Sequence, residues 1–358
     1  MGKPLESRDR ERDSVASGVT ISDVAEAARV SIRTVSRVIN NSTLVNKETR
    51  EAVQAVIKRL GFTPSSRARA LASGRSGLIG VVQDDPNALT LNDFQRGIVE
   101  TCSERSFELV VHPSKFASSR LVDDVVQFVR RSRVDGLIVL SPISEIAAIP
   151  TALTQLGVPV VGLASVRIPT YPAMIVSSER KATAELAEHF AALGHRRVAL
   201  ITGPRAYYSA TEREQGFRTG LDRHGITLSQ ECVREGDYGF ASGIRCAAEL
   251  FDLPSPPTAI FASNDIMAAG ALKEAHKRNL TVPGHVSIAG FDDSLIASMI
   301  SPALTSIRRP LLDMARQATE RLLLMISNGR VDRYADINAE LTLVTRESTG
   351  PVRPTTAR

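Results

Sequence analysis

The sequence is poor in the features that cross-link small extracellular domains or anchor a chain in a membrane. Its 358 residues include no tryptophan and three cysteines, Cys102, Cys232 and Cys246, which are far apart and form no C-x-x-C pair. This spacing argues against a disulfide framework and against a zinc site. No apolar run approaches the roughly 18 residues that a membrane span needs, and the first ten residues lack the apolar centre of a signal peptide. We therefore expect a cytoplasmic protein with reduced thiols, no metal, no cofactor and no membrane contact.

Positive charge is concentrated at the start of the chain. Residues 1–75 contain 14 Lys and Arg against 8 Asp and Glu, whereas the remaining residues contain 30 against 31. A basic head on a near-neutral body is the distribution expected when only the head contacts phosphate groups. The charge pattern therefore favours a nucleic-acid partner for the head.

Changes in polarity, charge and apolar periodicity along the chain predict five segments. Residues 1–18 are polar, alternate in charge and predict a disordered extension. Short helical periods follow, then a connector, then a long alternation of apolar runs and helical periods. The boundaries that we expect are 19–63 for the helical head, 64–75 for the connector, 76–350 for the body and 351–358 for the tail.

The head has the layout of a helix-turn-helix. Thr20 and Asp23 have the spacing of a capping box at the first helix, and Ser31 is placed to cap the second. A third helix is expected to start after Asn46 and to stop at Gly61.

The spacing of apolar and polar residues in the second helix of the head predicts one buried face and one polar face. The buried stripe is Val35, Val38 and Ile39, and the residues that project opposite it are Ile32, Arg33, Ser36 and Arg37. Arg33 and Arg37 lie one turn apart, so both can enter one major groove and donate hydrogen bonds to guanine O6 and N7. The alternative for these arginines is an ordinary solvated helix face.

The body alternates apolar runs with helices, which predicts a doubly wound α/β fold with parallel sheets. Strands are expected at 78–82, 107–111, 136–140, 159–163, 198–202, 259–262 and 286–290, and helices at 92–105, 120–132, 179–193, 211–224, 241–251, 265–278 and 310–328. This length exceeds one lobe, so we expect two lobes facing a cleft, one from about 76–176 plus 305–340 and one from about 177–304. Asn264 and Asp292 come at the carboxyl ends of expected strands, where ligands of such sheets bind.

From residue 19 to about residue 350 the sequence resembles the lactose/galactose repressor (LacI/GalR) family of bacterial transcriptional regulators. The match is carried by residues 34–40, 45–50 and 69–74 in the head and by residues 193–203, 263–271 and 290–293 in the body. The resemblance implies a body built like periplasmic sugar-binding proteins. One departure is Arg29, which stands where the family usually has a turn glycine. A positive φ at a residue with a Cβ costs on the order of 1 kcal/mol.

By that resemblance, the DNA contacts divide into base recognition, phosphate contact and insertion into the minor groove. The base-reading positions are Ile32, Arg33 and Arg37. The residues that contact or approach phosphates are Thr20, Ser31, Thr34, Ser36 and Asn40. Residues 65–73 would form a hinge helix, with Arg67 as a further DNA contact and Leu71 as an apolar wedge. Packing of Leu71 on its own domain is the alternative.

The resemblance also implies an effector site in the cleft, with contacts from Arg213, Asn264 and Asp292 and ring stacking on Tyr238. Such a set suits a sugar, a sugar acid or a sugar phosphate. The alternatives are turn capping for Asn264 and Asp292, and an exposed loop position for Tyr238. Arg213 has ion pairing with a neighbouring glutamate, Glu212 or Glu214, as its alternative.

Three further positions are candidate effector contacts. Asp85 and Asn87 follow the first expected strand of the body. Arg309 stands where several relatives have glutamine, which favours an anionic or uronic ligand.

Together these features predict a repressor of carbohydrate-related genes at the nucleoid. It would bind a palindromic operator as a homodimer and be released by a small sugar-like effector. The tail at 351–358 has no leucine-rich helix, which favours a dimer over a tetramer. A binding protein without DNA function would not need the basic head. An enzyme is disfavoured because the sequence has no P-loop and no G-x-S-x-G motif. The direction in which the effector changes DNA affinity stays open.

Overall fold

The computed structural model describes residues 19–39, 42–62, 75–84, 88–329 and 333–352. The chain divides into two compact units, Met1–Ser76 and Gly77–Arg358. The predicted extension, nearly all of the predicted hinge segment and most of the tail lie outside the described residues. So do five predicted site residues, Asn40, Arg67, Leu71, Asp85 and Asn87.

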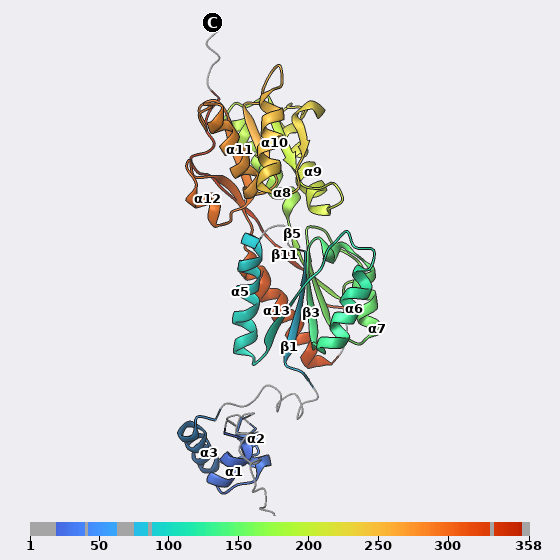
Figure 1. Cartoon of the computed structure of the whole chain (residues 1–358), viewed down its shortest axis with the longest axis vertical. Helices are drawn as coiled ribbons and strands as arrows, with labels where there is room; N and C mark the ends of the chain where they lie inside the picture. Colours follow the sequence, from blue (N-terminus) through green and yellow to red (C-terminus); the bar gives the residue numbers. More distant parts are fainter. Residues whose placement is uncertain (1–18, 40–41, 63–74, 85–87, 330–332, 353–358) are drawn as a thin grey trace, which may run out of the picture. The chain divides into compact units, whose positions relative to one another are not determined.

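The N-terminal unit packs helices α1 (Ile21–Ala27), α2 (Ile32–Ile39) and α3 (Lys47–Leu60) against one another (Figure 1). The predicted caps are confirmed. Thr20 and Asp23 form a capping box, Asn46 Oδ1 accepts a hydrogen bond from Thr49 N at 2.8 Å, and Gly61 ends α3 with a φ of 62°. The buried core of this unit consists of Val24, Ala25, Val35, Val38 and Val53.

The C-terminal unit contains two sheets, one in each lobe, and the predicted α/β architecture is confirmed. The first sheet has the order β11-β5-β4-β3-β1-β2, with β1 (Leu78–Gln83), β2 (Glu108–Pro113), β3 (Gly136–Leu140), β4 (Val160–Ala164), β5 (Ala173–Ser177) and β11 (Ile337–Ala339). The second has the order β12-β10-β9-β8-β6-β7, with β6 (Val198–Thr202), β7 (Val233–Glu235), β8 (Ala259–Ala262), β9 (Ser287–Asp292), β10 (Thr305–Arg308) and β12 (Thr342–Val344). Within the described residues, the strand pairings are parallel except that of β12 with β10.

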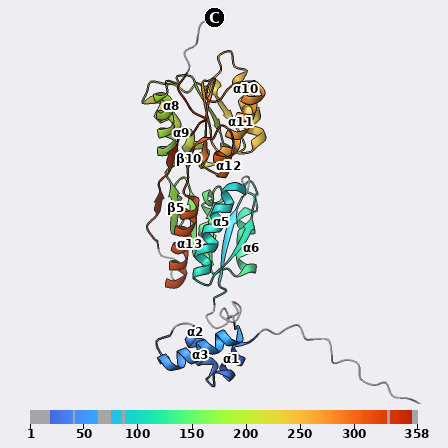
Figure 2. The ribbon, with the colours of Figure 1, turned by 90° about the vertical axis from the view of Figure 1, so that its left-hand side faces the viewer.

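Helices cover both faces of each sheet. The central strands are therefore buried on both sides, which is why their sequences are continuous apolar runs. On the first sheet, α5 (Ala88–Glu104) and α13 (Leu311–Asn328) cover one face, while α6 (Leu121–Ser132), η1 (Ile143–Glu145) and α7 (Ala148–Gln155) lie on the other. On the second sheet, α8 (Glu179–Ala192) packs with α9 (Tyr208–Asp222), and α10 (Phe240–Phe251) packs with α11 (Asp265–Lys277) on the opposite side (Figure 2). The short elements η2 (Gln230–Cys232) and α12 (Leu295–Met299) complete this lobe.

The chain passes between the lobes after β5, after β10 and after β11. The second passage differs from the sequence prediction, which assigned residues from 305 onward to the first lobe. Strand β10 instead pairs with β9 in the second sheet, Ser306 lying opposite Gly290. Its sequence, Thr305–Arg308, is short and three of its four residues are polar, so it lacks the apolar run that predicts the other strands. Strands β5, β7, β11 and β12 also have no counterpart among the predicted strands.

Candidate functional site

The outer face of α2 carries the predicted base-reading side chains. Ile32 is 50% exposed and Arg33 is exposed, whereas Val35 and Val38 are buried against α1 and α3. Arg37, one turn beyond Arg33, is half-buried. An exposed isoleucine beside two guanidinium groups presents both an apolar contact and fork-shaped donors to a groove.

The polar residues at the start of the two helices have local partners in the free head. Ser31 Oγ accepts from Thr34 N at 3.1 Å and lies 2.9 Å from Thr34 Oγ1. Thr20 N donates to Asp23 Oδ2 at 2.7 Å, and this backbone bond, followed by the Thr20 hydroxyl, lowers the pKa of Asp23. These exposed helix starts are where backbone N–H groups meet phosphates. Ser36, also half-buried, lies on the same helix.

The turn between α1 and α2 places Arg29 in the left-handed region, with a φ of 53°. The strain expected from the sequence at this position is therefore present. The turn keeps its shape because Val30 N donates to Ala25 O at 3.0 Å, closing α1.

A cavity of about 100 Å³ lies between the two lobes of the C-terminal unit. Its polar lining combines predicted residues with residues that were not predicted. The lining residues are Asp84, Thr90, Leu91, Phe94, Leu140, Ser141, Pro142, Leu163, Ser165, Glu179, Tyr207, Ser209, Arg213, Tyr238, Asn264, Asp292 and Arg309. The structure thus brings together all of the predicted effector residues that it describes.

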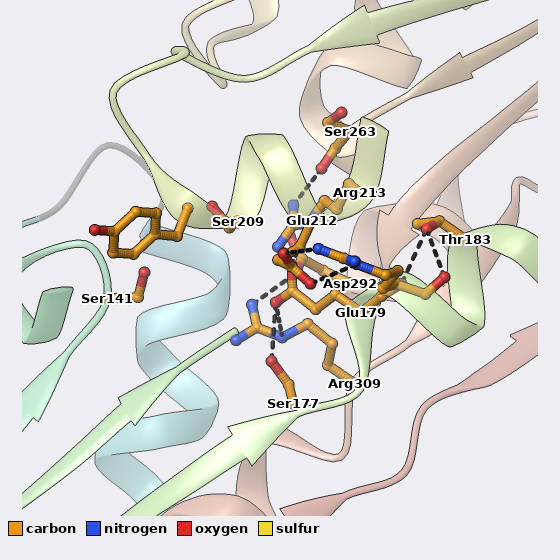
Figure 3. Close-up of polar contacts among 12 residues, drawn as sticks. Ser141, Ser177, Glu179, Thr183, Ser209, Glu212, Arg213, Ser263, Asp292 and Arg309 are labelled. Carbon is orange, nitrogen blue, oxygen red and sulfur yellow. Dashed lines mark hydrogen bonds and ion pairs between the residues drawn. The ribbon is translucent and has the colours of Figure 1, made fainter. Parts of the chain in front are cut away.

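Two buried ion pairs form the polar floor of the cavity (Figure 3). Arg213 Nε donates to Glu179 Oε2 at 2.7 Å, and Arg309 Nη1 donates to Asp292 Oδ1 at 3.0 Å. A 4.0 Å approach of Arg309 Nε to Glu179 Oε1 links the pairs. The alternative pairing of Arg213 with Glu212 or Glu214 is wrong, because these glutamates pair with Arg180 and Arg218.

Both members of the Arg213–Glu179 pair are held in their charged forms. Burial alone would raise the pKa of Glu179, but the guanidinium groups of Arg213 and Arg309 outweigh it and lower that pKa. Burial likewise works against the charge on Arg213, and Glu179 outweighs it, so the pKa of Arg213 is raised. For Asp292 burial is the larger effect, and its pKa is raised although Arg309 and Arg213 lie close.

Tyr238 forms an aromatic wall of the cavity, so the alternative of an exposed loop aromatic is wrong. Its side chain is 8% exposed, and its hydroxyl lies 3.1 Å from Ser209 Oγ. Gly203 makes room for the ring, since a Cβ there would lie 2.1 Å from Tyr238 Cζ. Asn264 supports this wall by donating from Nδ2 to Tyr238 O at 2.9 Å, and it also caps α11 by accepting from Met267 N at 2.8 Å. The capping role predicted as an alternative for Asn264 therefore coexists with its place in the cavity.

Two residues of the cavity lining have a positive φ, which is a strained conformation for a residue with a Cβ. Tyr238 has a φ of 66° and Asp292 a φ of 102°. Each such residue costs on the order of 1–3 kcal/mol and persists only where its surroundings fix it. Two buried polar atoms of the lining, Ser165 Oγ and Arg309 Nε, also make no hydrogen bond to the described residues. The cavity lining therefore combines positive-φ backbone with two buried polar atoms that make no hydrogen bond within the described part of the chain.

Glu179 is the main cavity residue that the sequence prediction missed. It begins α8 directly after β5, so it sits at a carboxyl strand end by the same rule that identified Asn264 and Asp292. The sequence did not predict Glu179 as a cavity residue because it did not predict β5 as a strand. Asp84, which directly follows β1, likewise lines the cavity and was not predicted.

Within the described residues, no group of three or more His, Cys, Asp or Glu could hold a metal ion. In the same part of the chain, no helix combines the length and apolarity of a membrane span.

Comparisons with known proteins match the chain over both units. A model of bacterial regulatory proteins of the lacI family matches residues 20–65, and one of a periplasmic binding protein-like domain matches residues 187–349. The chain is 30% identical over 315 residues to the probable HTH-type transcriptional repressor ExuR of Bacillus subtilis (strain 168), covering 86% of this chain and 92% of the relative. It is 32% identical over 340 residues to the HTH-type transcriptional regulator CelR of Thermobifida fusca, covering 92% and 98%.

Solved structures of similar proteins cover nearly the whole chain. A lac repressor dimer bound to operator and the anti-inducer ONPF has 30% identity and a TM-score of 0.78, covering 93% of this chain and 99% of that one. A complex of the transcriptional regulator CelR with cellobiose has 28% identity and a TM-score of 0.69, covering 92% and 99%.

Proposed function

The chain belongs to the lacI family of bacterial regulatory proteins, and from that premise we propose that it is a repressor of carbohydrate-related genes that binds a palindromic operator as a dimer. A small sugar-like effector releases it from the DNA. As a member of this family the chain is a DNA-binding transcriptional regulator and not an enzyme. We expect it to act in the cytoplasm, at the nucleoid.

The exposed face of α2 supports the DNA half of this proposal. Arg33 and Arg37 are spaced by one helical turn, and Ile32 is half exposed beside them. In this arrangement the two arginines read guanine edges, and Ile32 contacts an apolar base edge. Thr20, Ser31, Thr34 and Ser36 approach the phosphates. The predicted contacts of Asn40, Arg67 and Leu71 remain part of the proposal. A two-fold dimer would then place two α2 helices on the two half-sites of the operator.

The cavity between the lobes carries the effector half of the proposal, and its strained, buried polar lining is the single strongest observation. Arg213, Asn264, Asp292 and Arg309 offer donors and acceptors to ring hydroxyls. Tyr238 offers an aromatic face to the apolar side of a sugar ring. The neighbouring Asp85 and Asn87 are further proposed contacts.

The chain segments that connect the two lobes would transmit effector binding to the DNA-binding head. Glu179 lies just after the first passage and Arg309 lies within the second, so a ligand that engages either acts directly on a connecting segment. A change in the angle between lobes would alter the dimer contacts that support the hinge helices. Helices of about nine residues do not persist without such support, so they would melt and release the operator.

A ligand screen followed by DNA binding tests this function. Full-length protein is heated with neutral sugars, sugar acids and sugar phosphates, and a ligand of the folded state raises the melting temperature. Each hit is then added to the protein on a fluorescent operator duplex. We expect at least one saccharide to raise the melting temperature and to weaken operator binding by roughly 5–150-fold. A hit that tightens DNA binding would contradict release, and a screen without hits would contradict the saccharide class.

A further inference from the structure

Glu145 joins the two lobes at the rim of the effector cavity. It is the last residue of η1 in the first lobe and is 8% exposed. Its Oε2 accepts a hydrogen bond from Tyr208 N of the second lobe at 2.9 Å, and its Oε1 accepts from Ser141 Oγ at 2.8 Å. Ser144 Oγ anchors η1 by donating to Leu163 O at 2.6 Å. A carboxylate fixed on one lobe therefore holds a backbone donor of the other.

The donor that Glu145 holds belongs to a helix start with no side-chain cap of its own. Tyr208 is the first residue of α9, and the N-cap residue Tyr207 makes no side-chain capping bond. The first N–H groups of a helix have no partner inside the helix, so they need an acceptor from outside it. Glu145 thus acts as the cap of α9, supplied from across the cleft.

An aromatic contact accompanies this bond. Phe116 of the first lobe packs edge-on against Tyr207 of the second, with ring centroids 5.1 Å apart. Tyr207 in turn stacks on Tyr238, the aromatic wall of the cavity, at 6.1 Å. The Glu145 bond and this aromatic contact lie at the same corner, so opening the lobes there breaks both.

We propose that Glu145 is a proton-sensitive latch, which holds the lobes closed over the effector cavity by capping α9 and which closes more firmly as the pH falls. The closure itself can be measured without effector or DNA. Only its consequence, a pH-dependent effector affinity, rests on the proposed function.

The direction of the pH effect follows from the surroundings of Glu145 in the closed form. Burial raises the pKa of its carboxyl from 4.5 to about 6, although the bonds from Tyr208 and Ser141 lower it. The other groups that face it are Glu179, which raises this pKa, Arg213, which lowers it, and the neutral ring of Tyr207. An open cleft returns the carboxyl to water and to its ordinary value. Closure therefore takes up a proton between these pKa values and is favoured by acid.

These pKa values also fix the size of the effect. Lowering the pH from 7.5 to 5 raises the ratio of closed to open protein by about eightfold through Glu145. Other buried carboxyls also titrate in this range, since burial raises the pKa of Asp265 to about 7. A comparison of variants at Glu145 therefore has to separate its contribution from theirs.

Two variants isolate the latch. Glu145→Gln keeps an oxygen that accepts from Tyr208 N and has no charge, so it imitates the protonated latch. Tyr208→Pro deletes the donor together with the 48% exposed tyrosine side chain, and proline is well tolerated at the first position of a helix. Tyr207 already has the extended backbone that a residue before proline adopts, with φ −98° and ψ 131°.

The test is a distance measurement across the cleft in full-length protein without ligand. Spin labels are attached at exposed Gln127 on α6 and exposed Ala241 on α10, and distance distributions are recorded at pH 5 and pH 7.5. We expect the closed fraction of the wild type to rise in acid. The Glu145→Gln protein should be at least as closed at pH 7.5 and should lose the eightfold response. The Tyr208→Pro protein should be at least fivefold more open at both pH values, with an unchanged circular dichroism spectrum.

Two results would overturn the latch. One is a Tyr208→Pro protein that is as closed as the wild type. The other is a Glu145→Gln protein that keeps the full acid response, which would assign the response to other carboxyls. Neither result depends on whether the chain binds an operator or a sugar, so failure of the latch and failure of the proposed function are distinguishable.

Discussion

At the scale of single residues, three of the seven non-glycine residues with positive φ in the described part of the chain lie where the proposed function places DNA or effector contacts. Arg29 in the turn of the head and Tyr238 and Asp292 in the cavity all have positive φ. The sequence predicted the strain at Arg29, because a family glycine was replaced there. It could not predict the strain at Tyr238 or Asp292, because only the surrounding packing and ion pairs impose it.

Replacing Arg37 with alanine tests the base-reading role of α2. We expect Arg37→Ala to cost about 1–3 kcal/mol in specific operator binding and to relax base preference at one position of each half-site. The matched control is Arg59→Ala, which removes the same charge from an exposed position on α3. Titrations of matched and mismatched duplexes compare the two. Equal losses in both variants would make Arg37 a general charge and not a reader of bases.

Replacing Arg29 with glycine tests the strain in the turn. We expect Arg29→Gly to change the denaturant unfolding free energy of the head by about +0.5 to +1 kcal/mol, since glycine adopts a φ of 53° without a Cβ clash. The control is Arg29→Ala, which keeps a Cβ and should not stabilise the head. A gain in the alanine variant equal to that in the glycine variant would mean that charge, and not strain, governs this position.

Replacing Asp292 with asparagine tests the ion pair at the floor of the cavity. Asp292→Asn leaves the buried Arg309 without its nearest anion, which should lower the unfolding free energy by about 3 kcal/mol. We also expect the effector response to weaken at least tenfold, as in the deletion of a buried charged partner, while operator affinity is kept. The double variant Asp292→Asn, Arg309→Gln should recover stability. Wild-type induction in the single variant would remove Asp292 from the effector site.

At the scale of elements, the sequence predicted the features that neighbouring residues determine, namely helix caps and strands made of apolar runs. Caps at Thr20, Asn46 and Gly61 lie where local spacing put them, and long apolar runs became central strands. The strands it missed, such as β5 and β10, lie next to passages between lobes. Each pairs on one side with the preceding strand and on the other with a strand that comes later in the chain, β5 with β11 and β10 with β12, and this second pairing leaves no local signal. Glu179 was missed for this reason, and Glu145 because its partner Tyr208 comes from the other lobe.

The turn that joins β6 to α9 gives a test of how elements position the aromatic wall. In Gly203→Ala, the new Cβ would meet the ring of Tyr238, so we expect the ring to move and saccharide affinity to fall at least tenfold. Calorimetric titration of a hit from the ligand screen measures this. The control is Gly157→Ala, which lies outside the cavity lining. Its φ of 69° makes alanine strained there although no neighbour clashes, so it should lower stability without lowering saccharide affinity. Unchanged affinity in Gly203→Ala would show that Tyr238 does not set the shape of the ligand site.

At the scale of the whole molecule, charge and architecture divide the two tasks. The basic head carries the excess positive charge, and the near-neutral body holds its charges in internal pairs such as Arg213–Glu179. Two of the three segments that connect the lobes carry a cavity residue, Glu179 after β5 and Arg309 after β10, so a ligand in the cavity would contact both segments. The charge distribution predicted the basic head, and strand ends together with the family resemblance predicted the effector residues, whereas the geometry of the cavity needed the fold.

The central claim is that two copies of the head recognise two related half-sites of DNA. The most direct measurement selects duplexes from a randomised pool with full-length protein at moderate salt and then compares the selected sequence with a shuffled one. We predict an inverted repeat that binds at least a thousandfold more tightly than its shuffled version. Selection without an inverted repeat, or equal affinity for both duplexes, would contradict the claim.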